Sequence, residues 1–349
     1  MKAAGRNSGG GGARSGIRQV AEQAGVAISS VSRVLSNHPD VSDTMRMRVR
    51  EAVAQLHYEP DILAQSLRRG STWTIGFVIS NIANPLFAEI AIGAELALQK
   101  AGYSVLIANS LGAPERDVSQ IGLLKQRRVD GLILSLSDEE DPTTAAALKR
   151  LDKPFVLLDR VVRGLKTANS VLSDHAGGVR AAVAHLAGLG HRHIGFIGGS
   201  PRVRPSRERV AALQEACRLH GITASAVCGS YTSEYGEAAA AELLDGAGAA
   251  APTALLAGSN QILVGVLKTL RRRQLEVPRD ISLVTCDDLP LSEFLFVELA
   301  TIYRDIPKLG TTAAELLLAA LHGEPPREIM LPVEFRPGAS CARPRGQGA

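Results

Sequence analysis

Polar and aromatic side chains recur just after short apolar runs in the region that begins at Trp73, and their types suit a small polyhydroxylated ligand. Such a ligand needs carboxylates and amides that hold neighbouring hydroxyls, and a flat apolar wall for its ring. Phe87 and Tyr231 could enclose a ring, while Asp287 and Arg209 could hold its hydroxyls. The candidate residues are Asn84, Phe87, Ser137, Asp159, Arg160, Asp174, Arg209, Tyr231, Asn260 and Asp287. For each of them the alternative is a helix cap or an ordinary surface residue.

A second cluster of polar side chains lies on a short predicted helix from Ile28 to Leu35. Val31, Val34 and Leu35 fall at helical spacing and would face a core. The other side chains are mostly short hydroxyls and one guanidinium, groups that reach base edges and phosphates in the major groove of DNA. The candidate DNA-binding residues of this helix are Ile28, Ser29, Ser30, Ser32 and Arg33. The alternative is a small helical bundle whose arginines only meet solvent.

Catalytic and metal-binding patterns are weaker. His191 and His193 would share one face at a strand entrance, but the sequence offers no evident third ligand, so we expect no metal. Asp287 and Asp288 could form an acid and base pair, yet no Ser/His/Asp or Cys/His motif occurs in the right context. The run GFIGG at 195–199 lacks the spacing of a phosphate loop. We therefore expect neither a catalytic residue nor a cofactor.

Three short helices are predicted to position the N-terminal cluster. Gly25 suits the bend between the first helix and the helix that begins at Ile28. Ser42 or Asp43 is expected to cap the third helix. The apolar faces of the first and third helices are formed by Ile17, Val20, Ala21, Ala24, Met45, Val49, Val53 and Leu56.

The region after Trp73 reads as parallel strands that alternate with helices. In its first half, strands are predicted at 73–80, 103–110, 131–137 and 155–160, with helices at 86–101, 115–127 and 142–151. In its second half, strands are predicted at 170–174, 193–199, 226–231, 253–258 and 281–288, with helices at 176–189, 206–220, 234–245 and 259–273. A helix at 308–321 and one strand at 330–337 complete the pattern. This pattern predicts two doubly wound α/β subdomains with a cleft at the carboxyl ends of their strands.

The charge of the chain is concentrated at one end. The chain has 349 residues and a formal net charge of +4, and this length should hold two or three domains. Residues 1–70 contain 10 Lys and Arg against 6 Asp and Glu, which accounts for the whole excess. A basic head on a neutral body is typical of a nucleic-acid-binding domain attached to a larger one. A basic tail of no special function is the alternative, but these charges lie on predicted helices.

Cysteine usage and hydropathy indicate a cytoplasmic protein with no membrane contact. The chain has no C-x-x-C pair among its four cysteines, Cys217, Cys228, Cys286 and Cys341, so they fit a reducing compartment. The N-terminus lacks the apolar segment of a signal peptide. Glu242 and Asp245 interrupt the Ala-rich run near 238–251, so this run cannot span a bilayer. Residues 1–15 are Gly-rich and are predicted to be a disordered tail.

The two regions together resemble one known family. VAEQAGVAISSVSRVLS followed by VSDTMRMRVREAVAQLHYEPDILAQSL is similar to the headpiece of the LacI/GalR family of bacterial transcriptional regulators. The spacing of Tyr58, Pro60, Ala64 and Leu67 is the most specific part of this likeness. The body resembles the periplasmic-binding-protein-like core of the same family at NPLFAEI, RVDGLIL, VLLDR, SDHAGG, GHRHIGFIGG, PTALLAGSNQ and VPRDISLVTCDDLP.

The resemblance implies a fold and a function. The fold would be a small all-α helix-turn-helix headpiece joined to an α/β core of two doubly wound parallel-sheet subdomains. The headpiece would bind double-stranded operator DNA, Pro60 would open a hinge helix, and Leu67 would insert into the minor groove. A small-molecule effector, most simply a sugar, would bind between the subdomains and alter operator affinity. The regulator, a repressor as is usual in this family, would be a homodimer, with a tetramer as the alternative.

The expected domains are a tail at 1–15, the headpiece at 16–59, hinge helix and linker at 60–71, the effector-binding and dimerisation core at 72–340, and a tail at 341–349. Two other classes of protein are alternatives. A sugar or phosphosugar enzyme fused to a DNA-binding head would show turnover of a candidate sugar. A transport-type binding protein does not fit, because such a protein needs a signal peptide and has no headpiece.

Overall fold

The computed structural model describes residues 16–35, 38–58, 71–165, 168–246, 251–288 and 297–345. The chain forms two compact units, Met1–Thr72 and Trp73–Ala349. The predicted tail at 1–15 and the predicted hinge helix, including Leu67, lie outside the described residues.

The first unit contains three helices in its described part, α1 (Ile17–Ala24), α2 (Ile28–Leu35) and α3 (Asp43–Gln55). Their apolar faces meet at Val20, Val31 and Val49, which are fully buried. Gly25 ends α1 with a φ of 60°, a left-handed conformation that costs glycine little. Ser42 caps α3 by accepting a hydrogen bond from the backbone of Met45 at 3.4 Å. The three predicted helices are therefore confirmed, and of the two predicted caps Ser42 is the N-cap.

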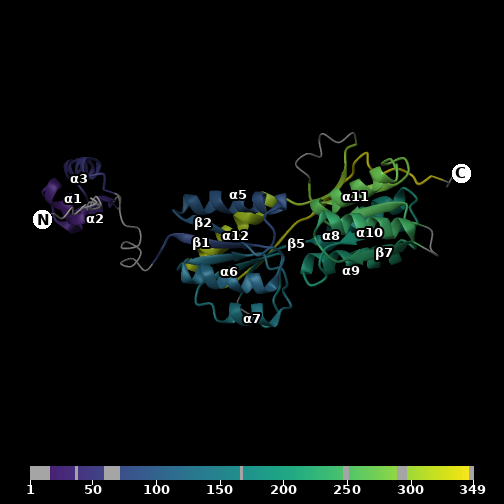
Figure 1. Ribbon diagram of the computed structural model, residues 1–349, viewed down its shortest axis with the longest axis horizontal. Helices are drawn as coiled ribbons and strands as arrows, with labels where there is room; N and C mark the ends of the chain where they lie inside the picture. Colours follow the sequence, from purple (N-terminus) through teal and green to yellow (C-terminus); the bar gives the residue numbers. More distant parts are fainter. Residues whose placement is uncertain are drawn as a thin grey trace, which may run out of the picture. The chain divides into compact units, whose positions relative to one another are not determined.

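The second unit contains two six-stranded sheets with the same strand order (Figure 1). In the first sheet the order is β11-β5-β4-β3-β1-β2. Its strands are β1 (Thr74–Ile79), β2 (Ser104–Asn109), β3 (Gly131–Leu134), β4 (Phe155–Leu158), β5 (Asn169–Ser173) and β11 (Glu328–Leu331). In the second sheet the order is β12-β10-β9-β8-β6-β7. Its strands are β6 (His193–Gly198), β7 (Thr223–Cys228), β8 (Ala254–Ala257), β9 (Ser282–Cys286), β10 (Ala300–Tyr303) and β12 (Glu334–Arg336). Each sheet is parallel except for β12, which is antiparallel to β10.

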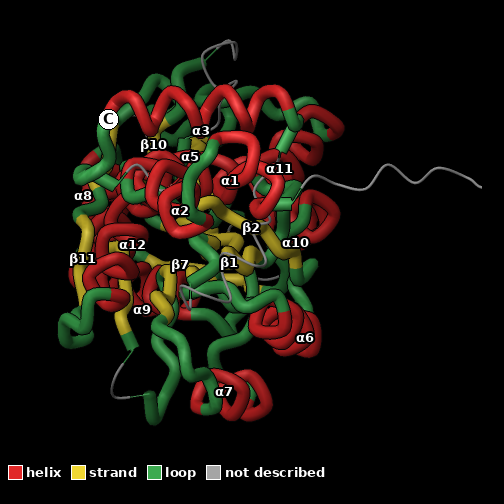
Figure 2. Tube along the Cα trace, turned by 90° about the vertical axis from the view of Figure 1, so that its left-hand side faces the viewer, coloured by secondary structure: helices red, strands yellow, loops and turns green. Residues whose placement is uncertain are grey.

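Helices cover both faces of each sheet, and Figure 2 shows the strands inside a layer of helices. On the first sheet, α5 (Pro85–Lys100) and α12 (Ile306–Leu321) cover one face, and α6 (Pro114–Gln126) and α7 (Pro142–Lys149) cover the other. On the second sheet, α8 (His175–Gly188) and α9 (Arg204–Leu219) lie opposite α10 (Ser233–Asp245) and α11 (Asn260–Arg272). Strands covered on both faces must be apolar throughout, which explains the continuous apolar runs of the sequence.

The polypeptide crosses between the two subdomains three times. The crossings follow β5, β10 and β11, because each of these strands leads directly into an element of the other subdomain. The two subdomains are thus joined along one side, and the carboxyl ends of their strands meet near the crossings. A site at this place can draw side chains from both sheets.

The structure confirms the predicted fold and corrects three details of it. The strand at 170–174, assigned to the second half of the region, is β5 and pairs with β4 in the first sheet. The single strand predicted at 330–337 is two strands in different sheets, because Pro332 has no N–H to donate and ends the first of them. The strand β10 was not predicted, since Thr301 interrupts the apolar run of its four residues, Ala300–Tyr303.

Two further differences are smaller. The strand predicted at 226–231 lies three residues earlier, at Thr223–Cys228, where small side chains weaken the apolar pattern. Residues 341–345, predicted as a tail, contact the second subdomain. Ser282 donates a hydrogen bond to the carbonyl of Ala342 at 3.1 Å, and Arg345 pairs with Asp280 at 2.8 Å.

Candidate functional site

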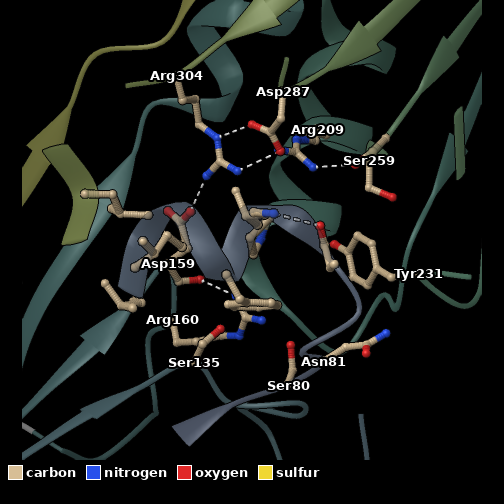
Figure 3. Close-up of a pocket in the computed structure, with 18 residues that line it drawn as sticks. Ser80, Asn81, Ser135, Asp159, Arg160, Arg209, Tyr231, Ser259, Asp287 and Arg304 are labelled. Carbon is tan, nitrogen blue, oxygen red and sulfur yellow. Dashed lines mark hydrogen bonds and ion pairs between the residues drawn. The ribbon is translucent and has the colours of Figure 1, made fainter. Parts of the chain in front are cut away.

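A pocket lies where the carboxyl ends of the two sheets meet (Figure 3). The empty space within it is about 660 Å³, including the space at its mouth. The first subdomain supplies one wall, and the second subdomain supplies the other. The lining residues are Ser80, Asn81, Asn84, Leu86, Phe87, Ile90, Ser135, Leu158, Asp159, Arg160, Pro205, Arg209, Tyr231, Gly258, Ser259, Asp287, Arg304 and Leu309.

Two buried aspartates occupy equivalent positions in the two subdomains. Asp159 directly follows β4, and Asp287 directly follows β9, the strand in the same place in the second sheet. Both have positive φ, 50° for Asp159 and 67° for Asp287. This conformation is uncommon for residues other than glycine and is concentrated at functional sites. The repeated fold therefore turns one carboxylate from each sheet toward the pocket.

Arg304 joins these two carboxylates. It follows β10 at the second crossing between the subdomains, and its side chain is buried. Its Nε and Nη2 donate to the two carboxylate oxygens of Asp287 at 2.7 and 2.9 Å, and its Nη1 donates to Asp159 Oδ2 at 2.5 Å. Such charge-assisted bonds from one planar group fix the relative positions of both partners. Arg304 thus connects the strand ends of the two subdomains at the bottom of the pocket.

The three groups hold one another in their charged forms. Burial by itself would raise the pKa of Asp287, but Arg304 and then Arg209 lower it below its usual range. Burial would also raise the pKa of Asp159, which His175, Arg304 and Arg204 together hold well below the usual value. Burial opposes the charge of Arg304, yet Asp287 and Asp159 raise its pKa above the ordinary value. The buried charges are therefore paired, as buried charges must be.

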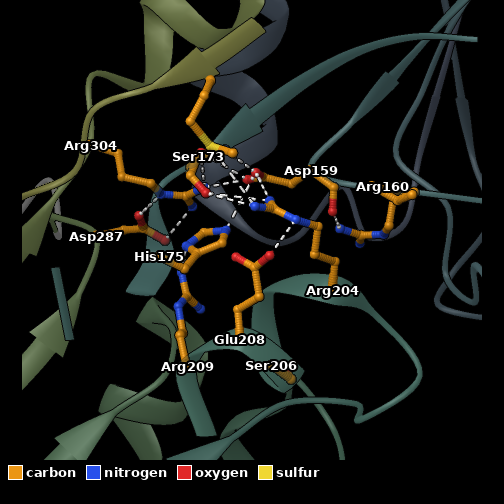
Figure 4. A network of polar contacts seen from close by, with 12 residues as sticks. Asp159, Arg160, Ser173, His175, Arg204, Ser206, Glu208, Arg209, Asp287 and Arg304 are labelled. Carbon is orange, nitrogen blue, oxygen red and sulfur yellow. Dashed lines mark hydrogen bonds and ion pairs between the residues drawn. The ribbon is translucent and has the colours of Figure 1, made fainter. Parts of the chain in front are cut away.

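A wider polar network surrounds this pair of aspartates (Figure 4). Ser173 at the end of β5 donates its backbone N–H to Asp159 Oδ1 at 2.7 Å, and Arg204 Nη1 lies 3.5 Å from the same oxygen. Arg204 also pairs with Glu208 one turn further along α9, at 2.7 Å. Among the residues labelled in Figure 4, Asp159, Glu208 and Asp287 carry carboxylates, and Arg160, Arg204, Arg209 and Arg304 carry guanidinium groups.

His175 is neutral within this network. It is fully buried, and burial, followed by the charge of Arg209, lowers its pKa to about 4. Arg209 Nη2 can only donate, so His175 Nδ1 accepts this bond at 3.2 Å and the imidazole proton lies on Nε2. Nε2 faces Asp159 Oδ1 at 3.4 Å. The neutral imidazole therefore lies between Arg209 and Asp159 and adds no charge to the network.

Arg209 and Tyr231 belong to the wall formed by the second subdomain. Arg209 Nη1 donates to the carbonyl of Gly258 at 2.8 Å, while its buried Nε has no hydrogen-bond partner among the described residues. The hydroxyl of Tyr231 lies 2.7 Å from the hydroxyl of Ser206. A buried N–H without an acceptor costs free energy, so a ligand oxygen placed at Arg209 Nε would recover a lost hydrogen bond.

The wall formed by the first subdomain is more apolar. Phe87, Ile90 and Leu158 are buried side chains of this wall. Asn84 begins α5 by accepting a hydrogen bond from the backbone of Leu86 at 3.1 Å. Arg160 Nε donates to the carbonyl of Leu136 at 2.6 Å, which fixes its guanidinium at the edge of the pocket.

The pocket brings together seven of the ten candidate residues, namely Asn84, Phe87, Asp159, Arg160, Arg209, Tyr231 and Asp287. The other three have local partners instead. Ser137 donates to Asp117 at 3.2 Å, and Asp174 caps α8 by accepting from the backbone of Gly177 at 2.9 Å. Asn260 Nδ2 donates to the carbonyl of Asp288 at 3.0 Å.

Sequence reasoning missed several polar residues of the pocket. Ser80, Asn81, Ser135 and Ser259 are small polar residues that lie one or two residues after a strand, and their positions at strand ends were the available signal. Arg304 gave no such signal, because the strand before it was not predicted. His191 and His193 lie elsewhere and bond to different hydroxyl groups, those of Thr253 and Ser225.

The candidate DNA-binding residues lie on α2 in the first unit. Ile28, Ser29 and Arg33 are exposed, while Ser30 and Ser32 are half-buried. Val31 and Val34 face the core of this unit, as predicted. The sixth candidate, Leu67, lies outside the described residues.

Comparisons with known proteins identify both units. Residues 16–61 match the family described as bacterial regulatory proteins, lacI family, and residues 183–341 match a periplasmic binding protein-like domain. The HTH-type transcriptional repressor PurR of Aliivibrio fischeri (strain MJ11) is 30% identical over 305 residues, which cover 86% of this chain and 90% of that protein. The chain belongs to the lacI family of bacterial regulatory proteins.

Two further relatives agree with this identification. The ribose operon repressor of Escherichia coli (strain K12) is 30% identical over 309 residues, which cover 86% of this chain and 92% of that repressor. The crystal structure of the Lac repressor dimer bound to operator and the anti-inducer ONPF superposes with a TM-score of 0.83 at 27% identity, covering 95% of this chain and 100% of that chain.

This LacI-family chain is a DNA-binding transcriptional regulator with a helix-turn-helix headpiece and an effector-binding core. Its relatives are transcriptional repressors, so the comparisons do not favour an enzyme fused to a DNA-binding head. Among the described residues, no helix is long and apolar enough to span a membrane.

Proposed function

We propose that this LacI-family regulator is a repressor whose effector is a small neutral sugar bound in the pocket between the subdomains. The observation that carries this proposal is the composition of the pocket. Strand-end carboxylates, hydroxyls and amides from both sheets surround a space with an apolar wall at Phe87, Ile90 and Leu158. A sugar offers hydroxyls to the first group and the C–H face of its ring to the second.

The charge of the network supports a neutral ligand. The carboxylates of Asp159, Glu208 and Asp287 next to the pocket are already balanced by guanidinium groups, because each is paired with Arg204 or Arg304. A ligand with a strong charge of its own would disturb this balance in a buried place, where an unpaired charge is costly. D-ribose is the first probe, because one relative is the ribose operon repressor of Escherichia coli. A purine base is the second, since another relative is the repressor PurR of Aliivibrio fischeri.

Each candidate residue has a role in this proposal. Arg209 Nε and Asp287 would hold sugar hydroxyls, and Phe87 and Tyr231 would enclose the ring. Asp159 and Arg160 would contact the ligand from the first subdomain. Ser137, Asp174 and Asn260 would act through the segments that they fix, because each bonds to its own surroundings.

The headpiece at 16–59 would bind operator DNA through the exposed face of α2. Ser29 and Arg33 would reach base edges or phosphates, as hydroxyls and guanidinium groups do in a major groove. Residues 60–71 would form the hinge helix and linker, with Leu67 in the minor groove, and residues 72–340 would form the core. The protein would act in the cytoplasm, where operator DNA is found.

A homodimer is part of this proposal. Ile92 and Leu96 on α5 are 55% and 56% exposed, and Leu106 and Ile107 on the neighbouring strand β2 are 43% and 49% exposed. The strand β2 is also an edge of the first sheet. Exposed apolar side chains beside an open sheet edge mark an interaction surface. The related Lac repressor is a dimer in its operator complex. Sedimentation velocity of the full chain would report a dimer or a tetramer, and a monomer at micromolar concentration would contradict this part.

Calorimetric titration of the full chain with D-ribose, other pentoses, hexoses and hypoxanthine tests the effector proposal. We expect saturable binding of at least one sugar, and loss of this binding in Arg209→Ala. The matched control is Arg218→Ala, which removes an exposed arginine from the same helix. The proposal fails if no sugar binds, or if both variants bind sugar as the wild type does. Binding of hypoxanthine but of no sugar would mean that the effector is a nucleobase.

A further inference from the structure

The two subdomains are also connected by ion pairs that lie apart from the three crossings of the chain. We propose that Arg202 and Arg207 of the second subdomain, together with Asp138 and Glu139 of the first, hold the pocket closed in the absence of effector. We refer to these four residues as the ionic clasp. This inference does not depend on which effector the pocket binds.

The clasp joins the loop after β3 of the first sheet to the segment after β6 of the second sheet. Asp138 and Glu139 lie between β3 and α7, in the acidic segment SDEED at 137–141. Arg202 precedes α9, and Arg207 lies in its first two turns. Arg202 pairs with Asp138, and Arg207 pairs with Glu139. A backbone hydrogen bond of 3.3 Å from Glu139 N to the carbonyl of Arg202 brings the two loops together.

The acidic half of the clasp is fixed in advance. The side chain of Glu139 is 0% exposed, and its Oε2 accepts the backbone N–H of Val161 at 2.8 Å. Asp138 Oδ1 accepts the backbone N–H of Glu140 at 2.8 Å. Because neighbouring N–H groups of the same subdomain already hold these carboxylates, they keep their positions when the arginines withdraw.

The two arginines of the clasp can separate from the carboxylates. The side chains of Arg202 and Arg207 are 55% and 40% exposed, so solvent can take over their charges when the subdomains separate. Arg207 Nη1 also lies 3.5 Å from Glu140 Oε1, a partner that is itself 44% exposed. A fixed buried acceptor and a mobile exposed donor form a reversible contact rather than a permanent one.

The clasp is next to the pocket in both subdomains. Val161, whose N–H binds Glu139, directly follows Arg160 of the pocket wall. Arg207 lies on α9 between Pro205 and Arg209, which both line the pocket. Closing the clasp therefore fixes the segments that carry Arg160 and Arg209. Arg202 and Arg207 are positioning residues, since neither lines the pocket itself.

The consequence is a closed state that exists before ligand binds. Opening of the clasp would widen the way into the pocket, and the clasp could form again over a bound ligand. Neutralising both arginines should move the equilibrium toward the open state by about tenfold, because an ion pair with an exposed arginine changes such an equilibrium constant by up to about fivefold. High salt should act in the same direction on the wild type.

Distances between spin labels test this inference directly. Labels carried by non-natural amino acids replace Lys149 on α7 and Leu219 on α9, two exposed positions in different subdomains. The labelled full chain is diluted with unlabelled chain, so that only distances within one chain are recorded. We expect the ligand-free wild type to give mainly a short distance, and the double variant Arg202→Gln, Arg207→Gln to give mainly a longer one.

The control is Arg192→Gln, which removes an exposed arginine at the opposite end of β6, away from the pocket. Arg192→Gln should keep the short distance between the labels. The double variant Arg202→Lys, Arg207→Lys should also keep it at low salt, because this variant preserves both positive charges. The inference is overturned if the double glutamine variant has the distance distribution of the wild type. It is equally overturned if the arginine-to-lysine variant opens as far as the glutamine variant, since the charges would then not be what holds the cleft.

Discussion

Replacing Arg304 by glutamine should destabilise the core strongly, because Arg304 pairs with two buried carboxylates at once. Its guanidinium makes two bonds to Asp287, at 2.7 and 2.9 Å, and one to Asp159 at 2.5 Å. Removal of one partner from a buried ion pair costs about 3–5 kcal/mol, since the remaining charge stays buried without compensation. In Arg304→Gln both aspartates lose their shared cation. We therefore expect a loss of at least about 3 kcal/mol at pH 7.

The loss should depend on pH in a defined direction. The pKa values of Asp159 and Asp287 are lowered in the folded wild type, so the stability that they contribute is present above about pH 4 and is lost as the pH falls through their folded values. Without Arg304, burial would raise both pKa values, and protonation at mildly acidic pH would relieve the uncompensated charge. The difference between wild type and variant should therefore shrink as the pH falls from 7 toward 4.

Urea unfolding of the full chain, followed by fluorescence, measures this difference. The single tryptophan, Trp73, lies at the start of the core and packs against Tyr103 with ring centroids 5.1 Å apart. Its emission therefore reports the core rather than the headpiece. The control is Arg327→Gln, which breaks a surface pair with Glu324 of 3.4 Å and should cost less than about 1 kcal/mol. If Arg304→Gln costs no more than this control, the proposed role of Arg304 is wrong.

Other substitutions test separate parts of the structure. The pKa of His175 is lowered to about 4, so its neutral form contributes stability above pH 6.5 that is lost as the pH falls toward 4. His175→Gln should remove up to about 3 kcal/mol of this pH dependence, measured by urea unfolding; an unchanged slope would contradict it. Gly310→Ala should destabilise the core by about 1–3 kcal/mol, because a Cβ there would lie 2.0 Å from the carbonyl oxygen of Ile90. The control is Gly122→Ala, whose Cβ would have no atom within 4 Å and which should therefore not destabilise the core. Ser29→Ala and Arg33→Ala should each weaken operator binding by about 1–3 kcal/mol in anisotropy titrations and leave sugar binding unchanged; a parallel loss of sugar affinity would refute the assignment of domains.

Most of the fold could be predicted from the sequence because strands covered on both faces leave continuous apolar runs. The ends of the core helices were predicted within about two residues, because each helix carries an apolar face that recurs at helical spacing. The exceptions are short or interrupted. Thr301 interrupts the four residues of β10, and Pro332 divides one apparent strand between two sheets. Periodicity alone does not say which sheet a strand joins, so β5 was placed in the wrong subdomain.

The candidate site was predictable only as far as strand ends revealed it. Asp159 and Asp287 follow clear apolar runs, and the repeated topology brings them together as expected. Arg304 could not be found in this way, because its role depends on a crossing between sheets that the sequence does not mark. The clasp of Arg202 and Arg207 with Asp138 and Glu139 was equally hidden. Charged residues in loops normally meet solvent, and only the closed arrangement of the two subdomains pairs these.

The central claim is that a sugar in the core pocket controls the binding of the headpiece to a specific DNA sequence. Its most direct test begins with selection of duplexes from a random pool by the full chain, followed by anisotropy titration of the enriched duplex with and without each candidate sugar. We predict an enriched inverted repeat, and an operator affinity that at least one sugar changes by about fivefold or more in the wild type but not in Arg209→Ala. An enriched site whose affinity no sugar alters, or alters equally in Arg209→Ala, would contradict the claim.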